Sequence, residues 1–256
     1  VIVDPDSRLT QLGLLPLCDA KGYYFFPSRE YSSGNNASLG QLASHWSASV
    51  FGGKGKADPT ISPARHDIDL GKRIVGLLGR QGRRPVVTVN FGIGENPKKR
   101  AGRDFEESVI SSLIQKELRV VLDRGASEEE SLRIDAVLGR VCGDASGIRV
   151  LDIDERSVSQ AEGEADIVVW NGRIGVLAGS IANSDLYIGY DSAGQHIAAA
   201  LGVPCIDVFA GYSSPKMLKR WKPTGRAETV VVDGEDRNPA DVANEVAIVT
   251  RRMVKR

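Results

Sequence analysis

From residue 85 onward, short apolar runs alternate with amphipathic segments, and this alternation constrains the fold more than any other feature of the chain. The apolar runs predict buried strands at 85–91, 118–123, 148–153, 186–190, 204–209 and 229–232. The segments between them have helical periodicity and predict helices at 104–116, 127–141, 174–183, 192–201 and 239–254. Strands that alternate with helices are joined by crossovers and run parallel, so the sequence predicts a doubly wound α/β sheet.

Residues 1–84 show a less complete pattern of the same kind. Strands are predicted at 1–4 and 23–27, helices at 9–18, 38–51 and 67–81, and a Gly- and Pro-rich linker at 52–63. Two or three strands are too few for a doubly wound sheet. We therefore expect an incomplete N-terminal domain at 1–84 and a complete Rossmann-like C-terminal domain at 85–256. The chain begins with a strand pattern at Val1 and lacks an initiator Met, which favours a leading segment that this sequence omits.

Composition excludes several classes of protein. The 256 residues hold 33 basic and 33 acidic side chains, so no basic excess marks a nucleic-acid partner. No apolar run approaches the roughly 18 residues of a membrane span. Cys18, Cys142 and Cys205 lie far apart in apolar stretches, which predicts buried thiols in a reducing compartment. We therefore expect a cytoplasmic protein.

The segment 185–215 carries the first functional motif. After the predicted strand 186–190, Asp191, Ser192, Ala193 and Gly194 lead directly into a helix of small residues. Ligands of open α/β sheets bind beyond the carboxyl ends of strands, and a helix N-terminus offers free N–H groups and a positive dipole end to a diphosphate. His196, about one turn later, can add a side-chain donor. The alternative is that Asp191 and Ser192 only cap the helix.

The segment 90–100 (NFGIGENPKKR) carries the second motif. Its Gly-x-Gly start is similar to a dinucleotide fingerprint, but Pro97 takes the position of the third glycine, so the fingerprint is incomplete. The basic run 98–100 suits phosphate neutralisation, with a solvated charge run as the alternative. Because both motifs follow parallel strands, we expect the Lys98 side chain and the backbone of 192–194 to surround one cleft.

On these residues the sequence resembles the ADP-heptose:lipopolysaccharide heptosyltransferase family, which are glycosyltransferases of the GT-B fold. The resemblance covers 85–232 well and 1–84 loosely. Its main motif is Asp191-Ser192-Ala193-Gly194-Gln195-His196, followed by Ala198-Ala199-Ala200-Leu201-Gly202 and Pro204. Lys98 stands seven residues before the aromatic Phe105, as the family pattern requires. Arg100 departs from the pattern where an aromatic is expected, and Ala193-Gly194 reverses the usual order of small residues, which leaves the donor sugar open.

The resemblance implies roles for individual residues. Lys98 would contact the donor phosphates, while Asp191 and the amides of 192–194 (Ser192, Ala193 and Gly194) would hold the diphosphate and the sugar. His196 would support that loop or touch a phosphate. Glu128 would bind the ribose hydroxyls, although the acidic run 128–130 is equally well explained as a first helical turn favoured by the helix dipole.

The resemblance also implies an inverting transfer of a sugar from a nucleoside-diphosphate donor to a glycan or lipid-linked acceptor such as the lipopolysaccharide core, with no cofactor. Peripheral contact with the inner membrane face is a further implication. The family's catalytic base is an Asp in a Gly-rich loop near the start of the N-terminal domain. No such loop is present here, so no catalytic residue is assigned, and we expect this chain to bind the donor without transferring the sugar. Asp4 and Asp6 remain alternative bases.

Three Asp-x-Asp pairs, at 4/6, 67/69 and 152/154, could chelate a divalent metal, but an acid-rich chain contains such pairs by chance, and we expect no metal. Two other functions stay open: a sugar-nucleotide epimerase of the same fold, and a non-catalytic module that binds nucleotide sugars. Analysis of reaction products would separate them.

Overall fold

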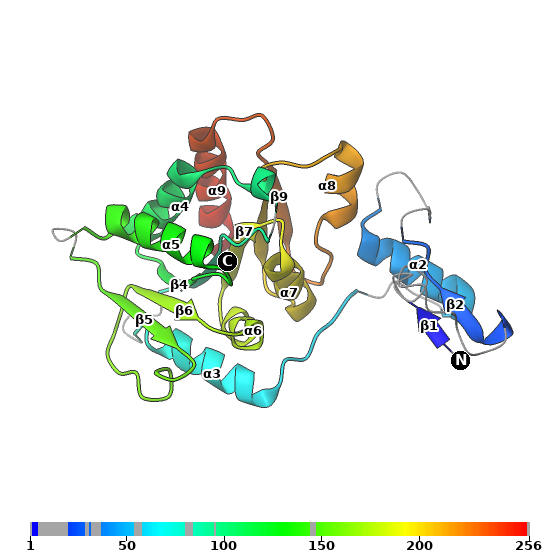
Figure 1. The fold of residues 1–256 in the computed structure, drawn as a ribbon, viewed down its shortest axis with the longest axis horizontal. Coiled ribbons are helices and arrows are strands. Elements are labelled where there is room, and N and C mark those ends of the chain that lie inside the picture. The colour runs from blue at the N-terminus through cyan, green and yellow to red at the C-terminus, as the bar shows by residue number, and fades with distance from the viewer. Residues whose placement is uncertain are drawn as a thin grey trace.

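The computed structural model is built around a seven-stranded parallel sheet with the strand order β5-β6-β4-β3-β7-β8-β9 (Figure 1). The structure describes residues 2–4, 20–28, 31, 37–53, 58–79, 84–94, 96–143 and 147–254. The strands of the large sheet are β3 (Val86–Asn90), β4 (Arg119–Asp123), β5 (Val150–Asp154), β6 (Ile167–Asn171), β7 (Leu186–Tyr190), β8 (Cys205–Phe209) and β9 (Thr229–Asp233). The predicted doubly wound α/β fold is confirmed.

The strand order reverses beside β3, which lies at the centre of the sheet. From β3 the chain builds β4, β5 and β6 on one side, then crosses to build β7, β8 and β9 on the other. β3, β7 and β8 are buried at every position because helices cover both faces. The crevice at the carboxyl ends of β3 and β7 is therefore the place where this kind of sheet binds ligands.

Alternate side chains of the strands enter two separate cores. Val87, Val89 and Leu122 belong to one cluster, whereas Val86 and Val121 belong to the other. The first core is covered by α4 (Arg103–Gln115), α5 (Glu128–Val141) and α9 (Pro239–Val254). The second is covered by α3 (Arg65–Gly76), α6 (Ile174–Ala182) and α7 (Ala193–Leu201). These helices follow the predicted amphipathic segments closely, except that α3 was predicted at 67–81 and ends at Gly76.

Among the described residues, one strand and one α-helix have no counterpart in the sequence prediction. β6 inserts between β5 and β4, and α8 (Pro215–Trp221) follows β8. The strand consists of the short run Ile167-Val168-Val169-Trp170, each residue of which is fully buried. It has an acidic, Gly-containing turn before it and a helix directly after it, so its short apolar signal merges with that of α6.

Helix α3 lies before the predicted boundary at residue 84, yet it packs tightly against α6 of the large sheet. A Cβ on Gly71 would lie 2.1 Å from the carbonyl carbon of Gly179, and a Cβ on Gly179 would lie 2.0 Å from the Asp67 carbonyl oxygen. Glycine at both positions lets the two backbones touch. Arg173 at the start of α6 adds an ion pair to Asp67 at 2.7 Å.

The N-terminal segment forms a small parallel sheet of β1 (Ile2–Asp4) and β2 (Tyr23–Phe25). The turn η1 (Ala20–Gly22) comes directly before β2, and the helix α2 (Leu39–Phe51) follows it in the chain. Ser38 and Gln41 form a capping box at the start of α2. Phe26 packs its ring 5.5 Å from the rings of both Tyr31 and Trp46. The predicted helix 9–18, with Cys18, lies outside the described residues.

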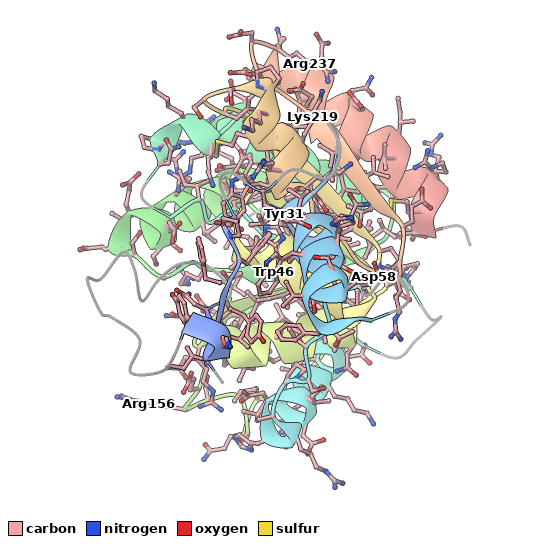
Figure 2. All side chains as sticks on the ribbon, turned by 90° about the vertical axis from the view of Figure 1, so that its right-hand side faces the viewer. Tyr31, Trp46, Asp58, Arg156, Lys219 and Arg237 are labelled. Carbon is pink, nitrogen blue, oxygen red and sulfur yellow. The ribbon has the colours of Figure 1, made fainter. Side chains whose placement is uncertain are left out.

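The N-terminal segment meets the larger sheet domain at α8. Arg220 donates hydrogen bonds to the backbone carbonyls of Ser28 and Tyr31, the latter at 3.0 Å. Ser38 Oγ lies 2.5 Å from Thr224 Oγ1 in the loop after α8. In Figure 2, Tyr31 and Trp46 lie on the face toward the viewer, with Lys219 of α8 above them.

Candidate functional site

A cavity of about 400 Å³ lies at the carboxyl ends of β3, β4, β6 and β7, in the crevice where the strand order reverses. Its lining residues come from the loops after these strands and from the first turns of the helices that follow. They are Asn90, Gly92, Ile93, Gly94, Lys99, Asp123, Gly125, Ala126, Glu130, Gly172, Ile174, Leu177, Asp191, Ser192, Ala193 and Gly194. Four of the seven predicted site residues, Asp191, Ser192, Ala193 and Gly194, are among them.

One wall of the cavity is the N-terminus of α7. Ser192 occupies the N-cap position with extended backbone, but its side chain makes no capping hydrogen bond. The alternative in which Asp191 and Ser192 only cap the helix is therefore wrong for the Ser192 side chain. The first amide groups of an uncapped helix have no intrahelical acceptor and present partial positive charge. This wall suits an anion.

Packing against β7 dictates the small residues of this wall. The ring of Tyr187 is fully buried directly beneath the turn. A Cβ on Gly194 would lie 2.0 Å from the Tyr187 hydroxyl oxygen, and a Cβ on Gly189 would lie 2.4 Å from the same atom. Glycine at both positions therefore allows α7 to begin immediately above the strand end.

Lys99 brings the positive side chain of the cavity. It is the last residue of the turn η2 (Pro97–Lys99). Its Nζ lies 2.8 Å from Asp191 Oδ2 and donates to the Asp191 carbonyl oxygen at 3.0 Å. The other carboxylate oxygen, Asp191 Oδ1, accepts a hydrogen bond from Gln195 Nε2 at 2.8 Å. This ion pair links the loop after β3 to the start of α7.

Lys98, the lysine selected from the sequence, is exposed and is not among the residues that line the cavity. Its backbone N–H donates to Asn96 Oδ1 at 3.2 Å. Its carbonyl oxygen packs against Gly211, where a Cβ would lie only 2.1 Å away. The spacing to Phe105 identifies this basic turn but does not show which of two adjacent lysines faces inward.

Arg100 completes the basic run by binding carboxylates rather than solvent. Its guanidinium lies 3.2 Å from Glu129 and 4.0 Å from both Glu106 and Glu130. Tyr190 donates to Glu106 at 3.2 Å, and burial raises the pKa of the Glu106 carboxyl, which has no exposed surface. The alternative of a solvated charge run is therefore wrong for Arg100, which fixes the basic loop to α4 and α5.

The opposite wall of the cavity is acidic and is organised by Glu130. Its Oε1 accepts from the Ile93 amide at 3.2 Å and its Oε2 accepts from the Ala126 amide at 2.9 Å, so one carboxylate joins the loops after β3 and β4. Gly125 has a φ of +89°, and a Cβ there would lie 2.6 Å from the Glu130 Cβ. Glu128, predicted from the same acidic run, is exposed at the start of α5 and does not line the cavity.

Asn90 and Asp123 form the floor of the cavity, and the sequence reasoning missed both. Asn90 Nδ2 donates to Asp123 Oδ2 at 2.6 Å, while Asn90 Oδ1 accepts from the Gly92 amide at 2.8 Å. Burial, with a contribution from nearby Glu130, raises the pKa of Asp123 to about 7. Asp123 ends a predicted strand and Asn90 is the last residue but one of another, which is the available signal, because strand ends meet at this edge of the sheet.

His196 lies on the other side of α7 and faces a second cavity, of about 390 Å³. This cavity is lined by Phe26, Ser28, Leu39, Gly40, Ala43, Pro59, His196, Arg220, Trp221, Lys222 and Thr224. Burial lowers the pKa of His196, and its ring centroid lies 6.2 Å from that of Trp221. His196 Nε2 lies 3.4 Å from Gln195 Nε2, and Gln195 in turn donates to Asp191, so side-chain contacts connect a residue of one cavity to a residue of the other.

Several acids of the Asp-x-Asp pairs have protein partners. Asp4 accepts from the Tyr23 hydroxyl at 3.0 Å, Asp67 pairs with Arg173, and Asp152 pairs with Arg124. No group of three or more His, Cys, Asp or Glu suited to a metal occurs among the described residues. Asp6 lies outside them, and metal-free donor binding stays a prediction.

Comparison with known proteins agrees with this geometry. Residues 171–246 match the model of glycosyltransferase family 9 (heptosyltransferase). A family 9 glycosyltransferase structure from Veillonella parvula has a TM-score of 0.58 at 14% identity over 89% of this chain and 55% of its own. The E. coli heptosyltransferase WaaC with ADP has a TM-score of 0.55 at 15% identity over 86% of this chain and 58% of its own.

No curated protein matches the chain. The chain spans just over half the length of these two solved structures. In the part of the chain that the structure describes, no helix is long and apolar enough to cross a membrane. The predicted resemblance is confirmed: the chain is similar to the glycosyltransferase family 9 heptosyltransferases in the sequence of residues 171–246 and in its GT-B-like fold.

Proposed function

We propose that this chain is the donor-binding part of a heptosyltransferase-like glycosyltransferase, which moves a sugar from a nucleoside diphosphate to a glycan or lipid-linked acceptor with inversion. The observation that carries the proposal is the cavity of about 400 Å³ at the β3/β7 crevice, with Lys99 and the start of α7 on one wall and carboxylates on the other. Its volume lies within the range of about 300–1,000 Å³ typical of small-molecule sites.

The cationic wall suits the diphosphate. The amides at the start of α7 point their N–H groups toward the cavity end of the helix, and the Lys99 ammonium lies beside them. In an inverting displacement, negative charge grows on the departing nucleoside diphosphate as the bond to the sugar breaks. Donors held in place before the reaction stabilise that charge without reorganisation, so Lys99 and α7 would act on the transition state as well as on the bound donor.

The acidic wall suits the hydroxyl groups of a nucleoside or sugar. Glu130 uses its two carboxylate oxygens to accept one backbone N–H each, and a carboxylate offers about four acceptor positions. Asp123 likewise borders the cavity beside Asn90. Hydroxyl donors therefore find acceptors here, while the diphosphate is directed away from this wall by like-charge repulsion.

The comparisons support the choice of ligand. The E. coli heptosyltransferase WaaC was solved with ADP and also with ADP-2-deoxy-2-fluoro heptose, and this chain has a similar fold at 15% identity to both structures. An adenine nucleotide is accordingly the first ligand to try. Under this proposal the acceptor is a glycan or lipid-linked molecule. The enzyme would bind it in the cytoplasm or at the cytoplasmic face of the inner membrane.

Adjacent lysines give a matched test of the proposal. Calorimetric titration with ADP should show that Lys99→Gln weakens binding by about 1.5–3 kcal/mol, because a charged hydrogen bond in a half-buried site is lost. Lys98→Gln, one residue away and exposed, should change binding by less than about 0.5 kcal/mol. ADP binding that is unaffected by Lys99→Gln, or lost with Lys98→Gln alone, would overturn the assignment.

The ligand itself is tested by a panel of nucleoside diphosphates titrated with and without a chelator. Binding of at least one of them, insensitive to the chelator, is expected, since the cationic wall is made by protein groups. Failure of every nucleotide in the panel to bind would sink the proposed function. Binding that disappears with chelator would overturn the metal-free part alone.

A further inference from the structure

Two buried carboxyl groups face one lysine at the start of α7. Lys99 pairs with Asp191, whose side chain is 5% exposed, and it also acts electrostatically on Asp207 of β8. Within the described residues no second lysine or arginine pairs with either carboxyl. When the cavity contains no anion, the positive charge of Lys99 is therefore balanced by these carboxyl groups.

Asp207 lies beneath this pair. It stands opposite Gly189 of β7 in the sheet register, has no exposed surface, and neither of its carboxylate oxygens has a hydrogen-bond partner among the described residues. The titratable groups that face it are Tyr187 of β7, Cys205 of its own strand, Asp191 and Lys99. Burial, reinforced by Asp191, holds the pKa of Asp207 well above its ordinary value, which favours its protonated form.

Asp191 is the one of the two carboxyl groups that forms an ion pair, with Lys99. Around it lie Lys99 from η2, Asp207 from β8, and Gln195 and His196 from α7. Burial lowers the pKa of the His196 imidazole, which favours its neutral form, and Gln195 carries no charge. Lys99 is therefore the group that balances the Asp191 charge.

A diphosphate at the start of α7 would compete with Asp191 for this lysine. The phosphate oxygens carry more charge than one carboxylate, and the helix amides hold them within reach of Lys99. Asp191 would then be a buried carboxylate without a cation, beside newly arrived negative charge. Such a group is unstable when ionised, and taking up a proton is the usual relief.

We propose that nucleotide binding breaks the ion pair between Lys99 and Asp191. Lys99 then pairs with the diphosphate, and Asp191 takes up one proton from solvent in the same step. The inference rests on the proposed function, because it takes a nucleoside diphosphate as the ligand of this cavity. The proton adds to Asp191 Oδ2, the oxygen that Lys99 leaves, while Gln195 Nε2 keeps its hydrogen bond to Asp191 Oδ1. No bond of the nucleotide is made or broken.

The test is calorimetric titration of the full chain with ADP at pH 8, in buffers of different ionisation enthalpy, which yields the number of protons taken up. A phosphate with a second pKa of about 6 is already fully ionised at pH 8, and the positive charge around the bound phosphate keeps it ionised. The nucleotide itself therefore takes up no proton on binding. Uptake should approach one proton per ADP, and the affinity should fall by up to about tenfold per pH unit above pH 7.5.

Variants identify the group that takes the proton. Asp191→Asn should bind ADP without proton uptake and without this pH dependence, while Asp207→Asn should keep the uptake, because it is Asp191 that pairs with Lys99 and would lose that partner to the nucleotide. Asp241→Asn, an exposed acid in α9, is the matched control and should behave as wild type.

The wild-type measurement decides the matter even if a variant fails to fold. ADP binding with no proton uptake would overturn the inference and leave the proposed function standing. Uptake that persists in Asp191→Asn, or that vanishes only in Asp207→Asn, would also overturn it. Absence of any nucleotide binding would instead remove the proposed function, and the inference with it.

Discussion

Replacing Gly194 by alanine should disturb both the stability of the sheet domain and the geometry of the cavity. The added Cβ would lie 2.0 Å from the Tyr187 hydroxyl oxygen and 2.7 Å from its Cζ, whereas ordinary contacts begin near 3.4 Å. Tyr187 is fully buried, so its ring cannot rotate away. The start of α7 must rise instead, by more than 1 Å along the line of the clash.

The expected size follows from this displacement. Overpacking a rigid core typically costs about 1–3 kcal/mol in the free energy of unfolding. Lifting the α7 amides also lengthens their hydrogen bonds to a bound diphosphate, each worth about 1.5–3 kcal/mol when charged. We therefore expect Gly194→Ala to lower the free energy of unfolding by about 1–3 kcal/mol and to weaken ADP binding at least tenfold.

Urea denaturation followed by circular dichroism measures the first quantity, and calorimetric titration with ADP measures the second. Gly139→Ala provides the control, because Gly139 lies inside α5 and a Cβ there would meet nothing within 4 Å. That change should raise the free energy of unfolding by about 0.5–1 kcal/mol through helix propensity, and the affinity for ADP should stay unchanged. A Gly194→Ala protein as stable as wild type, with unchanged ADP affinity, would refute the packing argument.

Two further predictions address the α3–α6 contact and the cavity floor. Gly179→Ala should lower the free energy of unfolding by about 1–3 kcal/mol in urea denaturation, because its Cβ would lie 2.0 Å from the Asp67 carbonyl oxygen; a neutral result would mean that the two helices separate easily. The pKa of Asp123 is raised from 3.8 to about 7, so between these pH values the folded state holds a proton that the unfolded state releases. The contribution of Asp123 to the free energy of unfolding is therefore fully present below pH 4 and declines as the pH rises to about 7. Asp123→Asn should remove a decline of a few kcal/mol between these pH values, and identical pH–stability curves for variant and wild type would contradict the assignment.

The cavity shows how a parallel sheet assembles a site from distant segments. Asn90, Asp123 and Asp191 each end or follow a different strand, yet the sheet brings them to one edge. Glu130 and Lys99 then reach in from the adjoining helix and turn, one holding two loops through backbone amides and the other holding the start of α7. The strand ends set the position of the site, and these two side chains set its charge.

Sequence patterns alone determined most of the strands and helices from residue 85 onward, with β6 and α8 as the exceptions. Hydrophobic periodicity reports burial directly, so the strands of the large sheet were predicted apart from β6, whose signal is merged with that of α6. The same patterns identified Asp191 and the small residues 192–194, because a turn from a buried strand into a small-residue helix is a local feature. Residues 9–18 lie outside the described part of the chain, so the helix predicted there stays a prediction.

Tertiary structure alone decided which side chains of a charged run face the cavity. Lys98, Lys99 and Arg100 are alike in sequence, but Gly211 packs against the Lys98 carbonyl while Glu106, Glu129 and Glu130 hold Arg100, which leaves Lys99 directed at Asp191. In the same way, the orientation of α5 turns Glu130 toward the cavity and Glu128 away from it. The pairing of β8 with β7 places Asp207 beneath the turn at 191–194. The orientation of a side chain depends on partners far away along the chain, and a local pattern carries no information about them.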